Sequence, residues 1–127
     1  MLNTFLDFFL GNNPNLVINA KAVHRGRSLK EELLNILPTQ KQIQEEATFD
    51  EVIKWFPENS DHPDIEKGVV FRKPDSQGEI IIQVFLDKSD RVLRDANGQV
   101  LGRKFVSKKI DDELLETFGN NNVIIVE

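Results

Sequence analysis

The stretch EIIIQVFLD, residues 79–87, decides the fold that we expect. Alternate side chains of a β-strand point to opposite faces of a sheet, and this stretch has apolar side chains at both sets of positions. A strand that is apolar on both faces belongs in the middle of a sheet. The strand-like run VVFRK, residues 69–73, precedes it, and the five residues PDSQG between the two runs have the composition of a hairpin connection.

A second hairpin is expected over RVLRDANGQVLGRKF, residues 91–105, because the Asn-Gly pair at 97–98 tolerates the positive φ of a tight turn. Two registers fit this turn. A two-residue turn pairs Arg94 with Leu101, whereas a turn with a bulge pairs Leu93 with Leu101. In both registers each face mixes apolar and charged side chains, so we expect the hairpin to stand partly away from the core.

Capping boxes predict the starts of two helices. Ser28 and Thr48 each stand three residues before a glutamate, an arrangement in which the hydroxyl accepts a hydrogen bond from the N–H of that glutamate. Apolar residues follow each box at helical spacing, namely Leu29, Leu33, Leu34 and Leu37 after the first and Phe49, Val52, Ile53 and Phe56 after the second. Between these helices, residues 39–47 fit either a further helix or a loop.

The C-terminal part predicts one more helix and one more strand. SKKIDDELLETFG, residues 107–119, has the periodicity of a helix that Gly119 ends. Its apolar side consists of Ile110, Leu114, Leu115 and Phe118. VIIVE, residues 123–127, predicts a short buried strand at a sheet edge. Because an exposed apolar edge invites aggregation, we expect the N-terminal helix or a second subunit to cover it.

The N-terminal part adds a short apolar helix over residues 2–10, a hinge at 12–15 and a strand over 16–23. The expected fold class is α+β, with an antiparallel or mixed sheet and helices on one face. A ferredoxin-like (split βαβ) sandwich with an inserted hairpin and an extra N-terminal helix is one topology that fits this order. We expect residues 1–13 to form the helix and hinge and residues 14–127 to form a single α+β domain.

Composition limits the function classes. The chain has 127 residues, of which 39% are hydrophobic and 29% charged, as in one globular domain. Its net charge of -5 gives no global attraction for nucleic acid or anionic lipid. Without cysteine there is no disulfide, thiol nucleophile or cysteine zinc site. No membrane-spanning stretch is expected, and the N-terminal segment is a poor signal peptide, so the expected location is the cytoplasm.

Basic residues cluster around the N-terminus of the Ser28 helix, namely Lys21, His24, Arg25, Arg27 and Lys30. A helix N-terminus can hold an anion. However, Ser28 already occupies one donor, Glu31 and Glu32 bring negative charge to the same turn, and no glycine-rich phosphate motif is present. We therefore favour a capped helix after a solvated loop, and anion binding by residues 21–30 stays open.

The sequence contains little evidence for a metal-binding or catalytic site. The loop at 58–66 contains carboxylates and His62, which can ligate zinc or manganese, but their spacing fits no structural zinc pattern. The run PDSQGEIII is similar to a metal-dependent nuclease signature, but Ile81 stands where that signature needs a lysine. We assign no catalytic, metal-binding or cofactor-binding residue and expect no cofactor.

The unusual side chains are apolar or basic. Phenylalanines crowd the segment 2–10, a tryptophan lies beside the apolar stripe of its helix, and cations line the second hairpin. Such residues commonly anchor protein contacts. The residues that we assign to partner binding are Phe5, Phe8, Phe9, Trp55, Arg91, Arg94, Arg103 and Lys104.

These observations favour a small cytoplasmic protein–protein interaction module without enzymatic activity, acting as a homodimer or as a subunit or adaptor of a larger assembly. One alternative is a metal-dependent enzyme that uses the acidic loop 58–66. Another is a nucleic-acid accessory protein that uses the basic hairpin 91–109, although the net negative charge disfavours nucleic acid.

Overall fold

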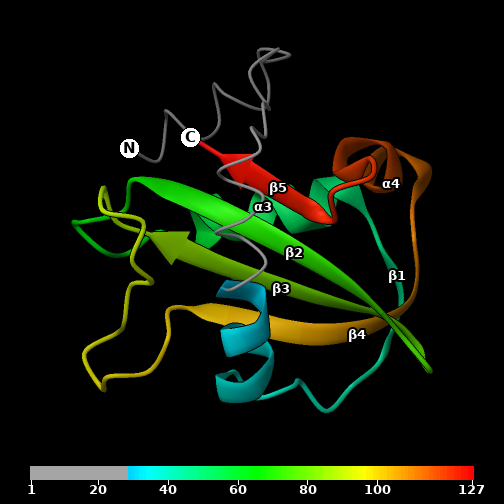
Figure 1. Cartoon of the computed structure of the whole chain (residues 1–127), viewed down its shortest axis with the longest axis horizontal. Coiled ribbons are helices and arrows are strands. Elements are labelled where there is room, and N and C mark those ends of the chain that lie inside the picture. The colour runs from blue at the N-terminus through cyan, green and yellow to red at the C-terminus, as the bar shows by residue number, and fades with distance from the viewer. Residues whose placement is uncertain (1–28) are drawn as a thin grey trace.

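The computed structural model describes residues 29–127 (Figure 1). Several expectations lie outside the described residues: the helix over 2–10 with Phe5, Phe8 and Phe9, the hinge at 12–15, the strand over 16–23, and Ser28 with most of the basic run.

One mixed sheet of five strands forms the centre of the described fold. Three consecutive antiparallel strands, β2 (Lys67–Asp75), β3 (Gly78–Leu86) and β4 (Gly102–Ile110), make its middle. At one edge β1 (Gln44–Ala47) runs parallel to β4, and at the other edge β5 (Val123–Val126) runs antiparallel to β2. The order β1-β4-β3-β2-β5 puts β3 in the centre, as its apolar character predicts, and confirms the α+β class.

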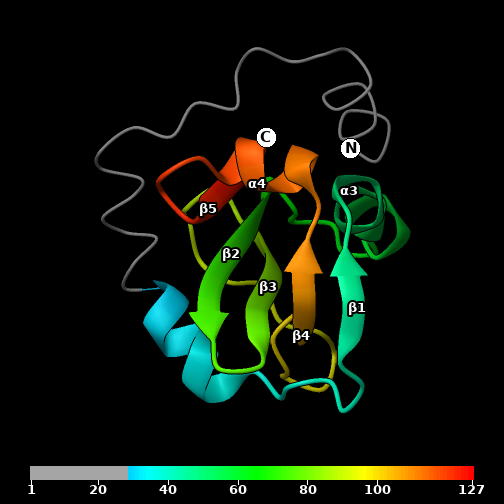
Figure 2. The same ribbon diagram turned by 90° about the vertical axis from the view of Figure 1, so that its right-hand side faces the viewer.

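Helices cover both faces of this sheet, not one as expected. In Figures 1 and 2, α3 (Phe49–Glu58) and α4 (Asp112–Phe118) lie on one face, and a helical segment at 29–36 lies on the other. The two-sided apolar character of β3 is the reason, because Ile81 and Phe85 need one cover and Ile82 and Val84 need another.

Each face has its own hydrophobic cluster. The first joins the two helices to the sheet and includes Val52, Ile53, Phe56, Leu114 and Phe118 with Val70, Ile81, Phe85 and Phe105. The second joins segment 29–36 to the opposite face and includes Leu33 and Leu37 with Val69, Phe71, Ile82 and Val84. The apolar stripes expected for these helices are therefore confirmed, except that Leu115 is 42% exposed and Ile110 lies in β4 and not in α4.

Capping decides where α3 and α4 begin. The Thr48 Oγ1 accepts a hydrogen bond from the Glu51 N–H at 3.1 Å, as the capping box predicts. The Asp111 carboxylate accepts from the N–H of Leu114 at 2.8 Å and from that of Phe49 at 3.1 Å. One side chain thus caps α4 and also binds the first residue of α3, so it ties the two helix starts together.

The expected last helix over 107–119 was too long at its start. Ser107–Ile110 instead complete β4, where they pair with β1 and β3, and the helix starts only after Asp111. Gly119 does end the helix: it adopts a φ of 56° and its N–H donates to the Leu115 carbonyl at 3.1 Å.

Residues 39–47 contain no helix. Thr39 makes an isolated bridge to Lys104, and Gln44–Ala47 form β1 beside β4. The glutamine and glutamate residues favour a helix on their own, but pairing with an existing strand outweighs this weak preference. The exposed Glu45 and Glu46 also put charge on an edge strand, which discourages pairing with other chains.

The connection between β2 and β3 is shorter than the five residues expected. The ladder continues to the pair Asp75–Gly78, which leaves only Ser76 and Gln77 in the turn. Pro74 is tolerated in β2 because β5 pairs only as far as Phe71, so this end of the strand lies at an edge.

The ferredoxin-like topology is not confirmed. β2 pairs directly with β5, and the consecutive strands β2, β3 and β4 are neighbours, whereas a split βαβ plan separates the second and last strands. The last strand does lie at an edge, and Val123, Ile124 and Val126 are buried. The N-terminal helix expected to cover it lies outside the described residues.

The second hairpin is an irregular excursion over residues 87–101. It is held by isolated bridges, including Arg94 to Val100, and by the hydrogen bond from the Leu101 N–H to the Leu93 carbonyl. This is the bulged register, and Gly98 adopts the positive φ of 80° that it requires. The excursion is also less detached than expected, because Leu93 is 7% exposed and belongs to the first cluster.

Candidate functional site

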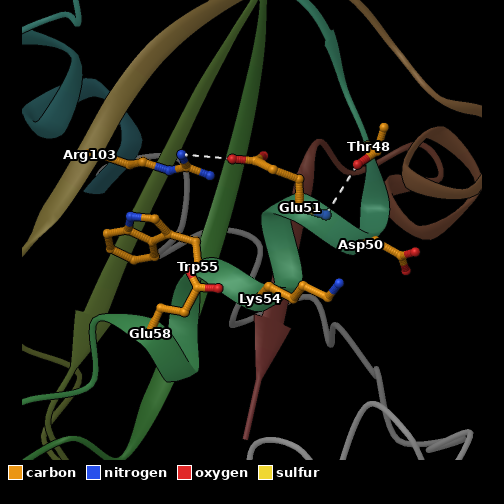
Figure 3. A pocket seen from close by; sticks show the side chains of 7 residues that line it. All are labelled: Thr48, Asp50, Glu51, Lys54, Trp55, Glu58 and Arg103. Atoms are coloured by element: carbon orange, nitrogen blue, oxygen red, sulfur yellow. Dashed lines mark hydrogen bonds and ion pairs between the residues drawn. The ribbon is translucent and has the colours of Figure 1, made fainter.

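A shallow recess opens on the outer side of α3. We call it the α3 recess; its volume is about 480 Å³, and it is lined by Thr48, Asp50, Glu51, Lys54, Trp55, Glu58 and Arg103 (Figure 3). All except Arg103 belong to α3 or its cap. Arg103 comes from the start of β4, and its side chain lies on the face of the sheet that α3 covers.

The guanidinium of Arg103 is fixed in this recess by two side chains. Its Nε and Nη2 donate to Gln83 Oε1 at 2.8 and 2.5 Å, and its Nη1 forms an ion pair with Glu51 Oε1 at 3.0 Å. Gln83 is fully buried and its Nε2 donates to the Val52 carbonyl at 2.8 Å, so the amide links β3, β4 and α3. The Arg103 side chain is only 10% exposed and therefore has little freedom.

Aromatic rings complete the site. The partly exposed Trp55 stacks on Phe85 at 5.4 Å between ring centroids and meets Phe56 edge to face at the same distance. The Arg103 guanidinium lies 5.3 Å from the Trp55 ring and 4.5 Å from the Phe105 ring. Both distances allow a cation–π attraction, which adds to the ion pair.

A second recess lies on the opposite face of the sheet. We call it the β4 recess; its volume is about 420 Å³, and it is lined by Ile36, Leu37, Pro38, Gln40, Arg94, Gly98, Gln99, Val100, Gly102, Arg103 and Lys104. It lies where the end of segment 29–36, the 94–100 turn and the start of β4 meet. Lys104 Nζ donates to the Leu34 carbonyl at 2.8 Å, near the C-terminal end of that segment.

The structure divides the residues that we assigned to partner binding. Trp55 and Arg103 meet in the α3 recess, and Arg94 and Lys104 line the β4 recess. Arg91 belongs to neither: its side chain is 78% exposed and pairs with Asp87 at 3.5 Å. Phe5, Phe8 and Phe9 lie outside the described residues.

The acidic loop does not assemble a metal site in the described part of the chain. Within residues 29–127, no three His, Cys, Asp or Glu side chains converge as a metal site would require. The loop is held instead by the fully buried Ile65 and by the Glu66 N–H, which donates to the Leu86 carbonyl at 2.9 Å. His62 Nδ1 accepts a hydrogen bond from the Asp64 N–H at 3.0 Å.

Sequence reasoning overlooked Gln83, Ile36 and the linking role of Asp111. Gln83 carries a visible signal, since it is the one polar residue between apolar neighbours in IIIQVFL. A buried amide must find partners, and Arg103 and Val52 supply them. Ile36 gives no such signal, because the exposure of a single isoleucine depends on packing that the pattern does not specify.

The chain matches no protein-family model, and comparisons with curated proteins and with solved structures give no significant match. Within residues 29–127, no helix has the length and apolar character needed to cross a membrane.

Proposed function

We propose that this chain is a small cytoplasmic protein–protein interaction module, without enzymatic activity, which serves as a subunit or adaptor and binds its partner through the α3 recess. The proposal depends on one observation: a partly exposed tryptophan is held beside a nearly buried arginine, Trp55 next to Arg103. Tryptophan and arginine are the side chains most enriched among those that dominate binding energy at protein interfaces.

The anchors are already in place before a partner arrives. Trp55 is stacked on Phe85, and Arg103 is held by Gln83 and Glu51. Ordering a free side chain on association costs roughly 0.5–1.5 kcal/mol, and a side chain that is fixed in advance avoids much of this cost. A rigid, partly apolar centre of this kind supports a role in recognition.

Charges surround this centre. Asp50, Lys54 and Glu58 are exposed at the edge of the α3 recess (Figure 3), and they present both signs. Charged rims contribute more to partner choice and association rate than to affinity. A partner with matching charges around an apolar contact fits this surface.

The test compares association of three full-length proteins. Affinity enrichment from cells that naturally produce the protein, followed by binding measurements with each enriched protein after purification, is carried out for the wild type, Trp55→Ala and the charge reversal Lys54→Glu. Glu116→Lys, on the exposed side of α4, serves as the matched surface control. Light scattering measures self-association of the same proteins.

We expect one partner, or a second copy of the chain, to bind the wild type and Glu116→Lys alike, to lose at least about ten-fold in affinity with Trp55→Ala, and to change its association rate with Lys54→Glu. A circular dichroism spectrum checks that Trp55→Ala is folded, and Lys54→Glu tests the surface without touching the core. The proposal fails if every interaction survives both α3 variants.

A further inference from the structure

The β4 recess has an unusual charge for an acidic chain. Its charged lining residues are Arg94, Arg103 and Lys104, and no aspartate or glutamate is among the described residues that line it. The Arg103 guanidinium is engaged on the α3 side, so Lys104 and Arg94 supply the cationic groups here. The remaining polar side chains are the amides of Gln40 and Gln99, which repel neither an anion nor a neutral group.

Lys104 is the central feature of this recess. It is 8% exposed, and its ammonium group donates to one backbone carbonyl, that of Leu34. Within residues 29–127, no carboxylate forms an ion pair with it, whereas Lys67 and Lys108 on the same sheet each have one. Burial lowers the pKa of Lys104 below its usual value of 10.5. A desolvated cation without a counter-ion is stabilised by any anion that reaches it.

Arg94 lies on the turn beside this lysine. Its Nη1 donates to the Gly98 carbonyl at 2.9 Å, which fixes the side chain against its own turn. A guanidinium has five N–H donors, so the donors of Arg94 that do not bind Gly98 can bind a carboxylate. The buried Lys104 and the exposed Arg94 thus both contribute positive charge to the lining of one recess.

The other walls are apolar. Ile36 is 46% exposed although it is a large aliphatic residue, and Leu37, Pro38 and Val100 line the same recess. The volume of about 420 Å³ lies within the range of roughly 300–1,000 Å³ that small-molecule sites occupy. An inorganic anion would leave these walls uncovered.

We propose that the β4 recess binds a small organic carboxylate, with the carboxylate at Lys104 and Arg94 and its apolar group against Ile36 and Val100. This site is on the opposite face of the sheet from the α3 recess and does not depend on the function proposed for that recess.

The test is a titration of the full-length protein, followed by NMR, with hexanoate as the probe. Acetate supplies the carboxylate without the apolar group, inorganic phosphate supplies another anion, and hexylamine supplies the same apolar chain with the opposite charge. We expect hexanoate to shift the amide signals of Ile36, Val100 and Lys104 and to raise the pKa of the Lys104 ammonium, because a bound carboxylate favours the charged form. Acetate and phosphate should bind at least about ten-fold more weakly, and hexylamine should leave these signals unchanged.

Variants locate the binding. Lys104→Met should weaken hexanoate binding by about ten-fold or more, since a charge-assisted hydrogen bond is lost. Arg94→Gln, on an exposed turn where folding is not at risk, should weaken it several-fold. Lys108→Met, which removes an exposed lysine of the same strand, should bind as the wild type does. Unchanged signals with hexanoate, binding that Lys104→Met and Arg94→Gln both retain, or phosphate binding as tight as that of hexanoate would each overturn the proposal.

Discussion

Two side chains hold the guanidinium of Arg103, the fully buried Gln83 and the exposed Glu51. The ion pair with Glu51 faces water and contributes little stability by itself. Gln83 matters more, because a buried guanidinium that lost its acceptor would keep unpaired donors in a place that water hardly reaches. The amide also binds the Val52 carbonyl, so it joins the α3 recess to the core.

We therefore expect Gln83→Leu to lower the free energy of unfolding by about 2–4 kcal/mol, measured by urea denaturation. The new side chain is apolar and of similar size, so the cost comes from the unpaired Arg103 donors and the lost bond to the Val52 carbonyl, and not from a cavity. Adding Arg103→Met should recover part of the loss, because both partners are then apolar. A double variant whose cost equals the sum of the single costs would show that the two residues are not coupled.

Lys104 allows a prediction about pH. Since burial lowers the folded-state pKa of Lys104 below 10.5, the unfolded chain binds more protons in the alkaline range. The contribution of Lys104 to the free energy of unfolding must then rise as pH increases toward 10.5. We expect the difference in unfolding free energy, wild type minus Lys104→Met, to increase from about pH 8 to about pH 10. A difference that stays level or falls over this range would contradict the burial of the ammonium.

At the scale of elements, Asp111 and Thr48 provide matched helix caps. Thr48 satisfies one N–H of α3, whereas Asp111 satisfies one N–H in each helix. A capping bond contributes about 1 kcal/mol, so Thr48→Ala should cost about 1 kcal/mol and Asp111→Ala about 2 kcal/mol in urea unfolding. Equal costs for the two variants would show that the hydrogen bond from the Phe49 N–H to Asp111 contributes nothing to the free energy of unfolding.

Two glycines of the turns provide a second comparison. Gly98 has a φ of 80° with open space where a Cβ would lie, so Gly98→Ala should cost about 1–2 kcal/mol from backbone strain alone. Gly78 has a φ of 136°, and a Cβ there would lie 2.2 Å from the Ser107 carbonyl oxygen of β4. We expect Gly78→Ala to cost more than Gly98→Ala in thermal unfolding, because β4 would also have to move. The reverse order would contradict the close approach of the turn to β4.

Local patterns were enough to predict the elements that have strong internal signals. The apolar run 79–87 gave a central strand, and the Thr48 box with its apolar stripe gave α3. The assignment of Ser107–Ile110 to a helix was wrong. No glycine or proline separates these four residues from the true helix, so the sequence pattern does not show where the strand ends. Their β structure comes from pairing with β1 and β3, which are distant in the sequence.

The candidate sites could be predicted only in part for the same reason. Trp55 and Arg103 are each predicted as contact residues, but their meeting depends on α3 packing on the face of the sheet to which Arg103 points. Arg103 and Lys104 are neighbours in the sequence and were grouped together, yet adjacent residues of a strand point to opposite faces. The structure accordingly places their charged groups on opposite sides of the sheet, against Gln83 and Leu34 respectively.

Residues 29–127 form a sheet that is covered on both faces, and its parts are expected to differ in stability. β3 has hydrogen-bonded neighbours on both sides, whereas the excursion 87–101 is held by isolated bridges. Amide exchange follows local opening, so we expect the slowest exchange in β3 and its partners and markedly faster exchange in 87–101. Hydrogen exchange measured by NMR tests this, and equal protection of both regions would contradict it.

The double role of Asp111 has a consequence for how the chain reaches its native state. The residues joined by the Asp111–Phe49 bond are 62 positions apart, so the start of α3 stays incompletely satisfied until the last third of the chain has docked. A contact between residues so far apart in the sequence slows folding. The entropy of closing a long loop is lost before the contact contributes any stabilising free energy. During synthesis from the N-terminus, the first turn of α3 would thus gain this hydrogen bond only once Asp111 has emerged and docked.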